Sequence, residues 1–170
     1  MKKVTIILTG VILMTIGTLS VNAQNASATA ATNATIIQPI AIVKTADLNF
    51  GNIVALTSQE TVTVSPAGVR SSSNALSLPT ATPGTINAAK FTVTGLADAT
   101  YSIVVPPSFN VSSGGNTMEV SNFTTTPTPT GVLAAGTQEL TVGATITVAG
   151  GQAAGTYTNA NALQITVAYN

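Results

Sequence analysis

Apolar and polar residues alternate most regularly in residues 142–170, the last stretch of the chain. Residues 144–148 place apolar side chains at every second position, with threonines between them. Residues 163–170 repeat the pattern with Leu163, Ile165, Val167 and Tyr169 on one face. A period of two, rich in β-branched residues, predicts strands with one buried and one solvent face. The glycines between the two runs favour a turn, so we predict a closing hairpin that completes the sheet formed by the rest of the chain.

Similar short runs recur along the chain, separated by glycine and proline. Before the closing hairpin, the predicted strands are 36–43, 60–65, 74–78, 90–94, 100–105 and 118–123, with 109–111 as a further short candidate; a short apolar pair at 48–51 and residues 139–142, which lead into the hairpin, lie between them. No window after the first residues has a helical period. Eight or nine short strands, spaced about ten residues apart, are typical of an all-β fold. We therefore predict an immunoglobulin-like β-sandwich.

The first predicted strand, 36–43, contains a proline. Ile40 and Ile42 share one face, while Ile36 and Ile37 precede Pro39. Because proline cannot donate a hydrogen bond to a neighbouring strand, this strand is predicted to lie at a sheet edge or to contain a bulge.

Residues 1–23 have the pattern of a secretory signal peptide. Lys2 and Lys3 precede an apolar run, and small residues follow it, so cleavage is expected after Ala23, with Ala28 as the second candidate. Residues 24–35 are small and polar, which predicts a flexible arm, and 36–170 are predicted to form one β-sandwich domain. The protein is expected in the periplasm, at the cell surface or outside the cell, with no membrane anchor after cleavage.

Composition restricts the chemistry. The chain has no His, Cys or Trp, and only 6% of its residues are charged. Without Lys2 and Lys3, three basic residues face five acidic ones, so no basic surface for nucleic acid is expected. The usual catalytic nucleophile pairs and zinc ligands are missing, and the carboxylates are scattered. We expect a protein that is not an enzyme and binds no cofactor or metal.

Several short motifs form an ordered pattern along the chain. They are Leu-Asn-Phe-Gly at 48–51, Phe-Thr-Val-Thr-Gly at 91–95, Tyr-Ser-Ile-Val-Val at 101–105, Gly-Asn-Thr-Met at 115–118, Gly-Thr-Tyr-Thr at 155–158 and Thr-Val-Ala-Tyr-Asn at 166–170. Over about residues 34–170, the pattern resembles a family of small secreted bacterial proteins catalogued as a domain of unknown function. It is more distantly similar to spore-coat-U and archaic chaperone–usher pilin domains.

The resemblance to pilins implies an incomplete sandwich, completed by a strand from the next subunit, and a periplasmic chaperone as a partner. We therefore expect an exported structural subunit of a surface fibre, coat or matrix, which assembles with copies of itself or related subunits through strand edges. The candidate assembly residues are Ile36, Ile37, Ile40, Ile42, Leu163, Ile165, Val167 and Tyr169. Whether residues 36–43 form the domain's own first strand or are donated stays open at this stage. The alternative is a surface adhesin or glycan-binding module.

Overall fold

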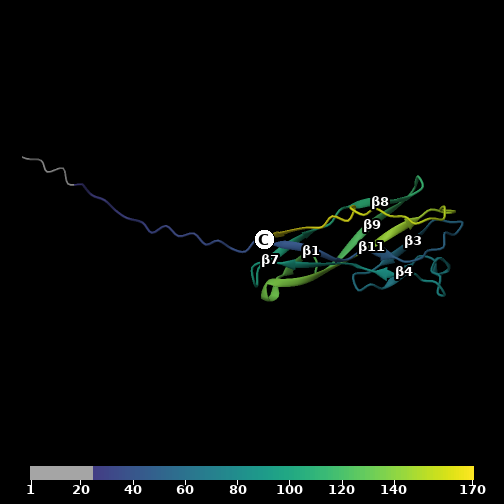
Figure 1. Cartoon of the computed structure of the whole chain (residues 1–170), viewed down its shortest axis with the longest axis horizontal. Helices are drawn as coiled ribbons and strands as arrows, with labels where there is room; N and C mark the ends of the chain where they lie inside the picture. The colour runs from purple at the N-terminus through teal and green to yellow at the C-terminus, as the bar shows by residue number, and fades with distance from the viewer. Residues whose placement is uncertain (1–24) are drawn as a thin grey trace, which may run out of the picture. The chain divides into compact units, whose positions relative to one another are not determined.

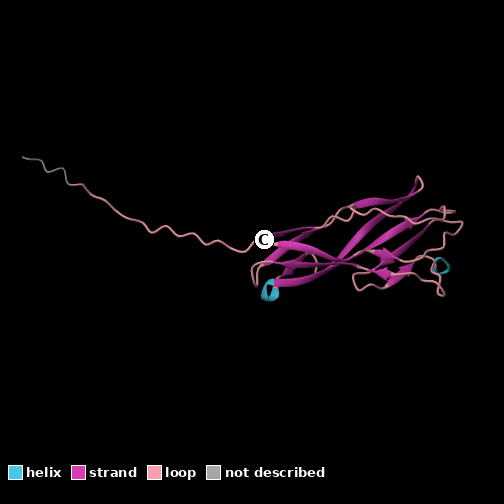
Figure 2. Ribbon diagram, viewed as in Figure 1, coloured by secondary structure: helices cyan, strands magenta, loops and turns pink. Residues whose placement is uncertain are grey.

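Antiparallel β-strands make up the fold (Figure 2). The computed structural model describes residues 25–170, so the predicted signal peptide lies outside the described residues. The chain separates into two units, Met1–Thr35 and Ile36–Asn170. Residues 25–35 are exposed and carry no helix or strand, and all the strands belong to the second unit.

Twelve strands are present in the described residues, and no α-helix. In chain order they are β1 (Ala41–Ala46), β2 (Asn49–Phe50), β3 (Glu60–Val64), β4 (Arg70–Ser72), β5 (Ile86–Asn87), β6 (Ala89–Thr94), β7 (Thr100–Val104), β8 (Ser108–Ser113), β9 (Asn116–Thr126), β10 (Thr130–Val132), β11 (Thr137–Val148) and β12 (Thr166–Tyr169). Two 3₁₀ turns, η1 (Ala75–Ser77) and η2 (Ala134–Gly136), complete the secondary structure. The all-β prediction is confirmed. The number of strands exceeds the prediction because β2, β4, β5 and β10 are only two or three residues long, too short to show an alternating pattern.

The long strand β11 organises the largest sheet, which has seven strands (Figure 1). β6 and then β3 pair along one edge of β11, and β9 pairs along the other edge. β1 and β4 extend the first side, and β8 extends the second. A three-stranded sheet, in the order β10-β7-β12, forms a second layer, and β2 pairs with β5 separately. The seven-stranded sheet curls, so it encloses apolar side chains on its inner face.

The predicted closing hairpin is wrong. β11 lies in the seven-stranded sheet, whereas β12 pairs with β7 in the other layer. The long connection after Val148 crosses between the layers, because alternation specifies which face is buried but not which strand is the neighbour. The predicted buried face is confirmed: Ile165 is 9% exposed, and Leu163, Val167 and Tyr169 pack against the same core.

The first strand begins later than predicted. β1 starts at Ala41, after Pro39, and it is an edge strand that pairs only with β6 among the described strands. Ile42 is half-buried and packs on the core, as does Ile40 just before the strand. Proline therefore ends the pairing instead of lying within it, as expected for a residue that lacks the backbone N–H.

The strand predicted for residues 74–78 is also wrong. This segment forms the turn η1, because the Asn74 side chain accepts a hydrogen bond from the Leu76 N–H at 3.1 Å. Such a side-chain cap stabilises a tight turn. It leaves Leu76 exposed, while Leu78 packs against the core.

Two apolar clusters form the core. The first lies between the two larger sheets and includes Phe91, Tyr101, Leu140 and Ile165. The second lies on the inner face of β3, β9 and β11 and includes Val62, Val120, Ile146 and Val148. The three-stranded sheet contributes Tyr101 to the first cluster but no residue to the second, so the two halves of the seven-stranded sheet are covered differently.

The buried Tyr101 gives a prediction for alkaline pH. Its hydroxyl donates to Gln138 Oε1 at 2.9 Å, and burial raises the pKa of this hydroxyl above its ordinary value. A tyrosine in the unfolded chain ionises near pH ~10, while the folded chain keeps the proton. Below about pH 10, Tyr101 should leave the free energy of unfolding unchanged. As the pH rises above about 10, the free energy of unfolding should fall, because only the unfolded chain loses the proton. Denaturant titrations between pH 8 and 11 should show a smaller fall in Tyr101→Phe; equal falls in the two proteins would contradict this role.

Candidate functional site

The second cluster is the floor of an open cleft. Phe109 and Val111 from β8, Met118 from β9, and Ile146 and Val148 from β11 all line it. These side chains share a face because alternate residues of a strand point the same way. The three residues from β8 and β9 are only partly buried, although they are apolar. The floor is therefore an inner sheet face that no second sheet covers.

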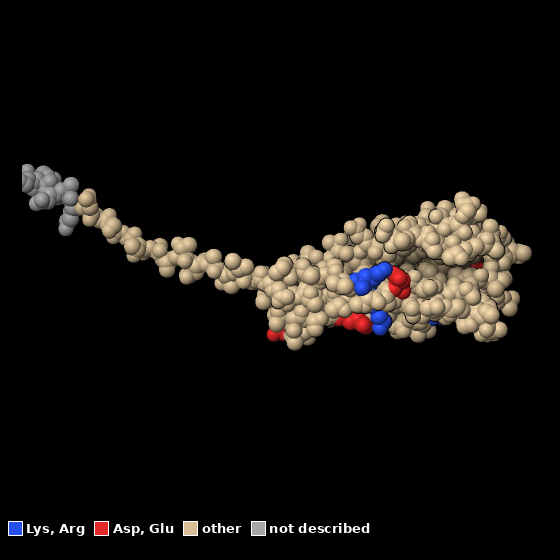
Figure 3. Space-filling view, in the orientation of Figure 1, with Lys and Arg blue, Asp and Glu red and all other residues tan. Residues whose placement is uncertain are grey.

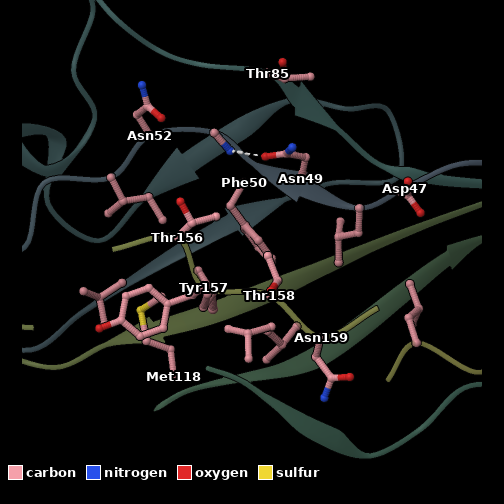
Figure 4. Close-up of a pocket in the computed structure, with 18 of the residues that line it drawn as sticks. Asp47, Asn49, Phe50, Asn52, Thr85, Met118, Thr156, Tyr157, Thr158 and Asn159 are labelled. Atoms are coloured by element: carbon pink, nitrogen blue, oxygen red, sulfur yellow. Dashed lines mark hydrogen bonds between the residues drawn. The ribbon is translucent and has the colours of Figure 1, made fainter. Parts of the chain in front are cut away.

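Two extended segments form the walls of the cleft. The first wall is residues 48–55, and the second wall is residues 152–160 with Leu163. Together with the floor they enclose about 1060 Å³. Charged side chains are few on this face of the domain, and the surface is hollowed (Figure 3). Figure 4 shows Phe50 of the first wall and Met118 of the floor directed into this space.

The first wall presents an unpaired backbone edge to the cleft. The N–H groups of Asn52 and Val54 donate to the carbonyl oxygens of Pro83 and Ser77, at 2.8 and 2.9 Å, on the outer side. In an extended chain, successive residues direct their N–H and C=O groups to opposite sides, so Ile53 and Ala55 direct theirs away from Pro83 and Ser77. Ile53 and Ala55 therefore face the cleft, and their backbone groups have no backbone partner among the described residues.

The second wall is arranged in the same way. The backbone of Thr158 pairs with Ser112 of β8 in both directions, at 3.1 and 3.2 Å, so this wall continues the curl of the seven-stranded sheet. Tyr157 and Asn159, on either side of Thr158, then direct their backbone groups toward the cleft. The Tyr157 hydroxyl holds the wall in shape by donating to the Ala153 carbonyl oxygen at 2.7 Å. Two unpaired edges thus face each other across an apolar floor.

The charges around the cleft are mostly paired with each other. Lys44 pairs with Asp47, and both line the cleft. Arg70 donates to the carbonyl oxygens of Phe50 and Asn52, both at 2.9 Å, which fixes the outer side of the first wall. Glu60 is different: it is 4% exposed, and neither carboxylate oxygen has a hydrogen-bond partner among the described residues.

The predicted assembly residues fall into two groups. Ile36 is 98% exposed and Ile37 is 50% exposed, and both precede β1. The other six pack against the first core cluster: Ile40, Ile42, Leu163, Ile165, Val167 and Tyr169. The hydroxyl of Tyr169 also accepts from the Leu96 N–H at 2.6 Å and donates to the Gln38 carbonyl oxygen at 2.8 Å. The structure thus brings the segment before β1 next to β12, and only Leu163 of the eight also lines the cleft.

The cleft residues on β8 and β9 were not predicted as a site. Their alternating pattern does predict an inner face, which Met118 and Val120 share. The alternating pattern does not reveal that no strand covers this face, because the covering depends on how residues 48–55 and 152–160 cross the sheet.

The described residues contain no cluster of metal-binding side chains. No three His, Cys, Asp or Glu side chains in residues 25–170 come together so that they could hold a metal ion. Over the same residues, no helix has the length and apolar character needed to cross a membrane. The arrangement of the cleft is suited to binding an extended chain, through backbone hydrogen bonds at its walls and apolar contacts at its floor.

Comparison with known proteins identifies the family. No curated protein and no solved structure matches the chain. A family model does match, and it covers most of the second unit, including both walls and the floor of the cleft. The chain belongs to the family described as Domain of unknown function (DUF4402), which matches residues 40–169.

Proposed function

We propose that this protein is a non-enzymatic, exported structural subunit of a bacterial surface fibre, coat or matrix, and that one copy inserts an extended strand into the cleft of another. The observation that carries the proposal is the pair of unpaired wall edges facing each other over an uncovered apolar floor. An inserted strand would supply hydrogen-bond partners to both walls and would cover Val111 and Met118. The resemblance of the sequence motifs to pilin domains, which are completed by a neighbour's strand, favours the same assembly.

The segment before β1 is the strand that a second copy would insert. Residues 25–39 are exposed and carry no secondary structure, so they are available for pairing. Residues 24–40 contain no charged side chain, which matches the nearly uncharged cleft. Ile36 and Ile37 supply apolar side chains at the end of the segment nearest β1. β1 itself pairs with β6 within its own copy, which favours the residues before β1 as the donated strand.

Deleting residues 25–37 tests this assembly. We expect the variant to keep the melting temperature of the full chain, because the deletion ends before Gln38 and Ile40, which contact Tyr169 and the core. We expect it to lose higher-order assemblies in size-exclusion chromatography and negative-stain microscopy. A variant with residues 25–37 replaced by a Gly-Ser segment of equal length is the control for length. Assemblies that persist in both variants would show that the segment is not the donated strand.

The second candidate is a surface adhesin or glycan-binding module. The observation in its favour is that Tyr157 lines the cleft together with amide side chains such as Asn49 and Asn159 (Figure 4). Aromatic faces and amide groups are common contacts for sugars. Glycan-array binding by the monomer, lost in Tyr157→Ala, would favour this function over strand insertion.

A further inference from the structure

Glu60 is a buried carboxylate that makes no hydrogen bond within the described residues. It begins β3, and its side chain lies on the inner face with Val62 and Val64, because burial alternates along this strand. Neither of its oxygens has a hydrogen-bond partner among the described residues. A buried, unpaired carboxylate destabilises a folded protein. Residues that break a local rule in this way are often found at functional sites.

No basic residue of the described chain is available to pair with Glu60. The basic residues in residues 25–170 are Lys44, Arg70 and Lys90. Lys44 pairs with Asp47, and Lys90 lies 3.5 Å from Glu139. Arg70 is held by carbonyl oxygens of the first wall and of Pro83. A positively charged side chain or terminus that pairs with Glu60 would therefore belong to another molecule.

Glu60 does not itself line the cleft, but it lies beside one end of the cleft floor. It pairs across the ladder with Val148, which lines the floor. The connections from floor to walls meet at this end: the Gly151 N–H donates to the Leu56 carbonyl oxygen at 2.7 Å. Gly150 permits this approach, since a side chain there would overlap the Thr57 carbonyl oxygen. A strand inserted into the cleft must therefore end at this closed end. The terminus of the inserted strand is then the part nearest Glu60.

The wall edges alone do not fix the direction of an inserted strand. The first wall runs toward Glu60 and the second wall runs away from it, so any inserted strand is antiparallel to one wall and parallel to the other. Antiparallel and parallel pairings differ only slightly in stability per residue. A charge at one end of the cleft can therefore decide the direction.

We propose that Glu60 binds the amino-terminal ammonium group of the strand that a second copy inserts, and so sets the direction of insertion. This inference rests on the proposed function, because removal of the signal peptide creates the amino terminus. The ammonium group is the one positive charge that residues 24–40 can bring, since these residues include no lysine or arginine. Residues 55–58, which lead into β3, make one backbone hydrogen bond among the described residues, from the Gly151 N–H to the Leu56 carbonyl oxygen, so this segment can shift to admit the strand end.

Synthetic peptides that compete with assembly test the proposal. Peptides spanning 24–40 and 29–40 match the two cleavage points, and each is made with a free and with an acetylated amino terminus. They are added to the full exported chain, and assembly is followed by light scattering. We expect the free peptide that matches the true cleavage point to inhibit assembly at a concentration at least tenfold lower than its acetylated form. In Glu60→Gln, the two forms should inhibit equally.

The outcomes separate this inference from the proposed function. Equal inhibition of the unmodified chain by free and acetylated peptides would overturn the role of Glu60 and leave strand insertion standing. No inhibition by any peptide, in a chain that assembles, would overturn strand insertion by this segment and the role of Glu60 with it. The comparison of peptides on the unmodified chain needs no folded variant. A tenfold difference that persists in Glu60→Gln would place the ammonium site at another residue.

Discussion

Replacing Ile165 with aspartate is expected to unfold the domain at temperatures where the native protein is stable. Ile165 is 9% exposed and packs in the cluster between the two larger sheets, with Tyr101 and Leu140. An aspartate there would bury a charge that no basic residue of the cluster can pair. The cost should exceed about 3 kcal/mol, which is a large part of the stability of a typical domain. Thermal unfolding followed by circular dichroism should show a melting temperature lower by roughly 10 °C or more, or no transition.

The next residue gives a matched control. Thr166 is exposed and lies on the opposite face of the same segment. Thr166→Asp adds the same charge to the same part of the chain, but the carboxylate stays in water. Its melting temperature should stay within a few degrees of the native value, because surface substitutions usually change stability by about 0.5 kcal/mol or less. Equal melting temperatures for the two variants would show that the face assignment of residues 163–169 is wrong.

The face of each strand was predictable from the sequence, but its neighbours were not. Val62 and Val64, Phe91 and Val93 are buried where alternation placed them. The same alternation predicted a hairpin between the last two strands, and the structure separates them into two layers. A period of two reports which side chains avoid water, and this is satisfied equally well by any partner strand that covers the same face.

The cleft was beyond prediction for a related reason. Phe109, Val111 and Met118 alternate with polar residues, so the sequence marks them as inward-facing and gives no sign that they are uncovered. Their exposure arises because residues 48–55 and 152–160 cross the sheet with a gap between them. That gap depends on contacts distant in sequence, such as the pairing of Thr158 with Ser112 and the hydrogen bonds from Arg70 to the first wall. Glu60 follows the alternation as well, but a charged residue in an inward position was not recognised as a site.

Replacing Ala55 with proline is expected to abolish assembly while the monomer stays folded. Ala55 is exposed in the first wall, and its N–H faces the cleft without a backbone partner among the described residues. The monomer therefore loses no hydrogen bond. An inserted strand would turn the first wall into a central strand, and proline is not tolerated there because it cannot donate and its ring obstructs the neighbour. Size-exclusion chromatography should show monomer at concentrations at least tenfold above those at which the native protein assembles.

The adjacent position reverses the expectation and tests which edge of the first wall is free. The Val54 N–H donates to the Ser77 carbonyl oxygen at 2.9 Å, away from the cleft. Val54→Pro removes this bond and leaves the Ser77 oxygen without its donor, so the monomer should lose about 1–3 kcal/mol of stability. Ala55→Pro should show the native melting temperature and no assembly, and Val54→Pro a lower melting temperature. Normal assembly of Ala55→Pro would show that the cleft-facing edge of this wall does not pair with a strand. A native melting temperature for Val54→Pro would show that the two edges of the wall have been assigned the wrong way round. Both substitutions introduce proline, they are one residue apart and both side chains are exposed, so the direction of the backbone N–H is the main difference between them.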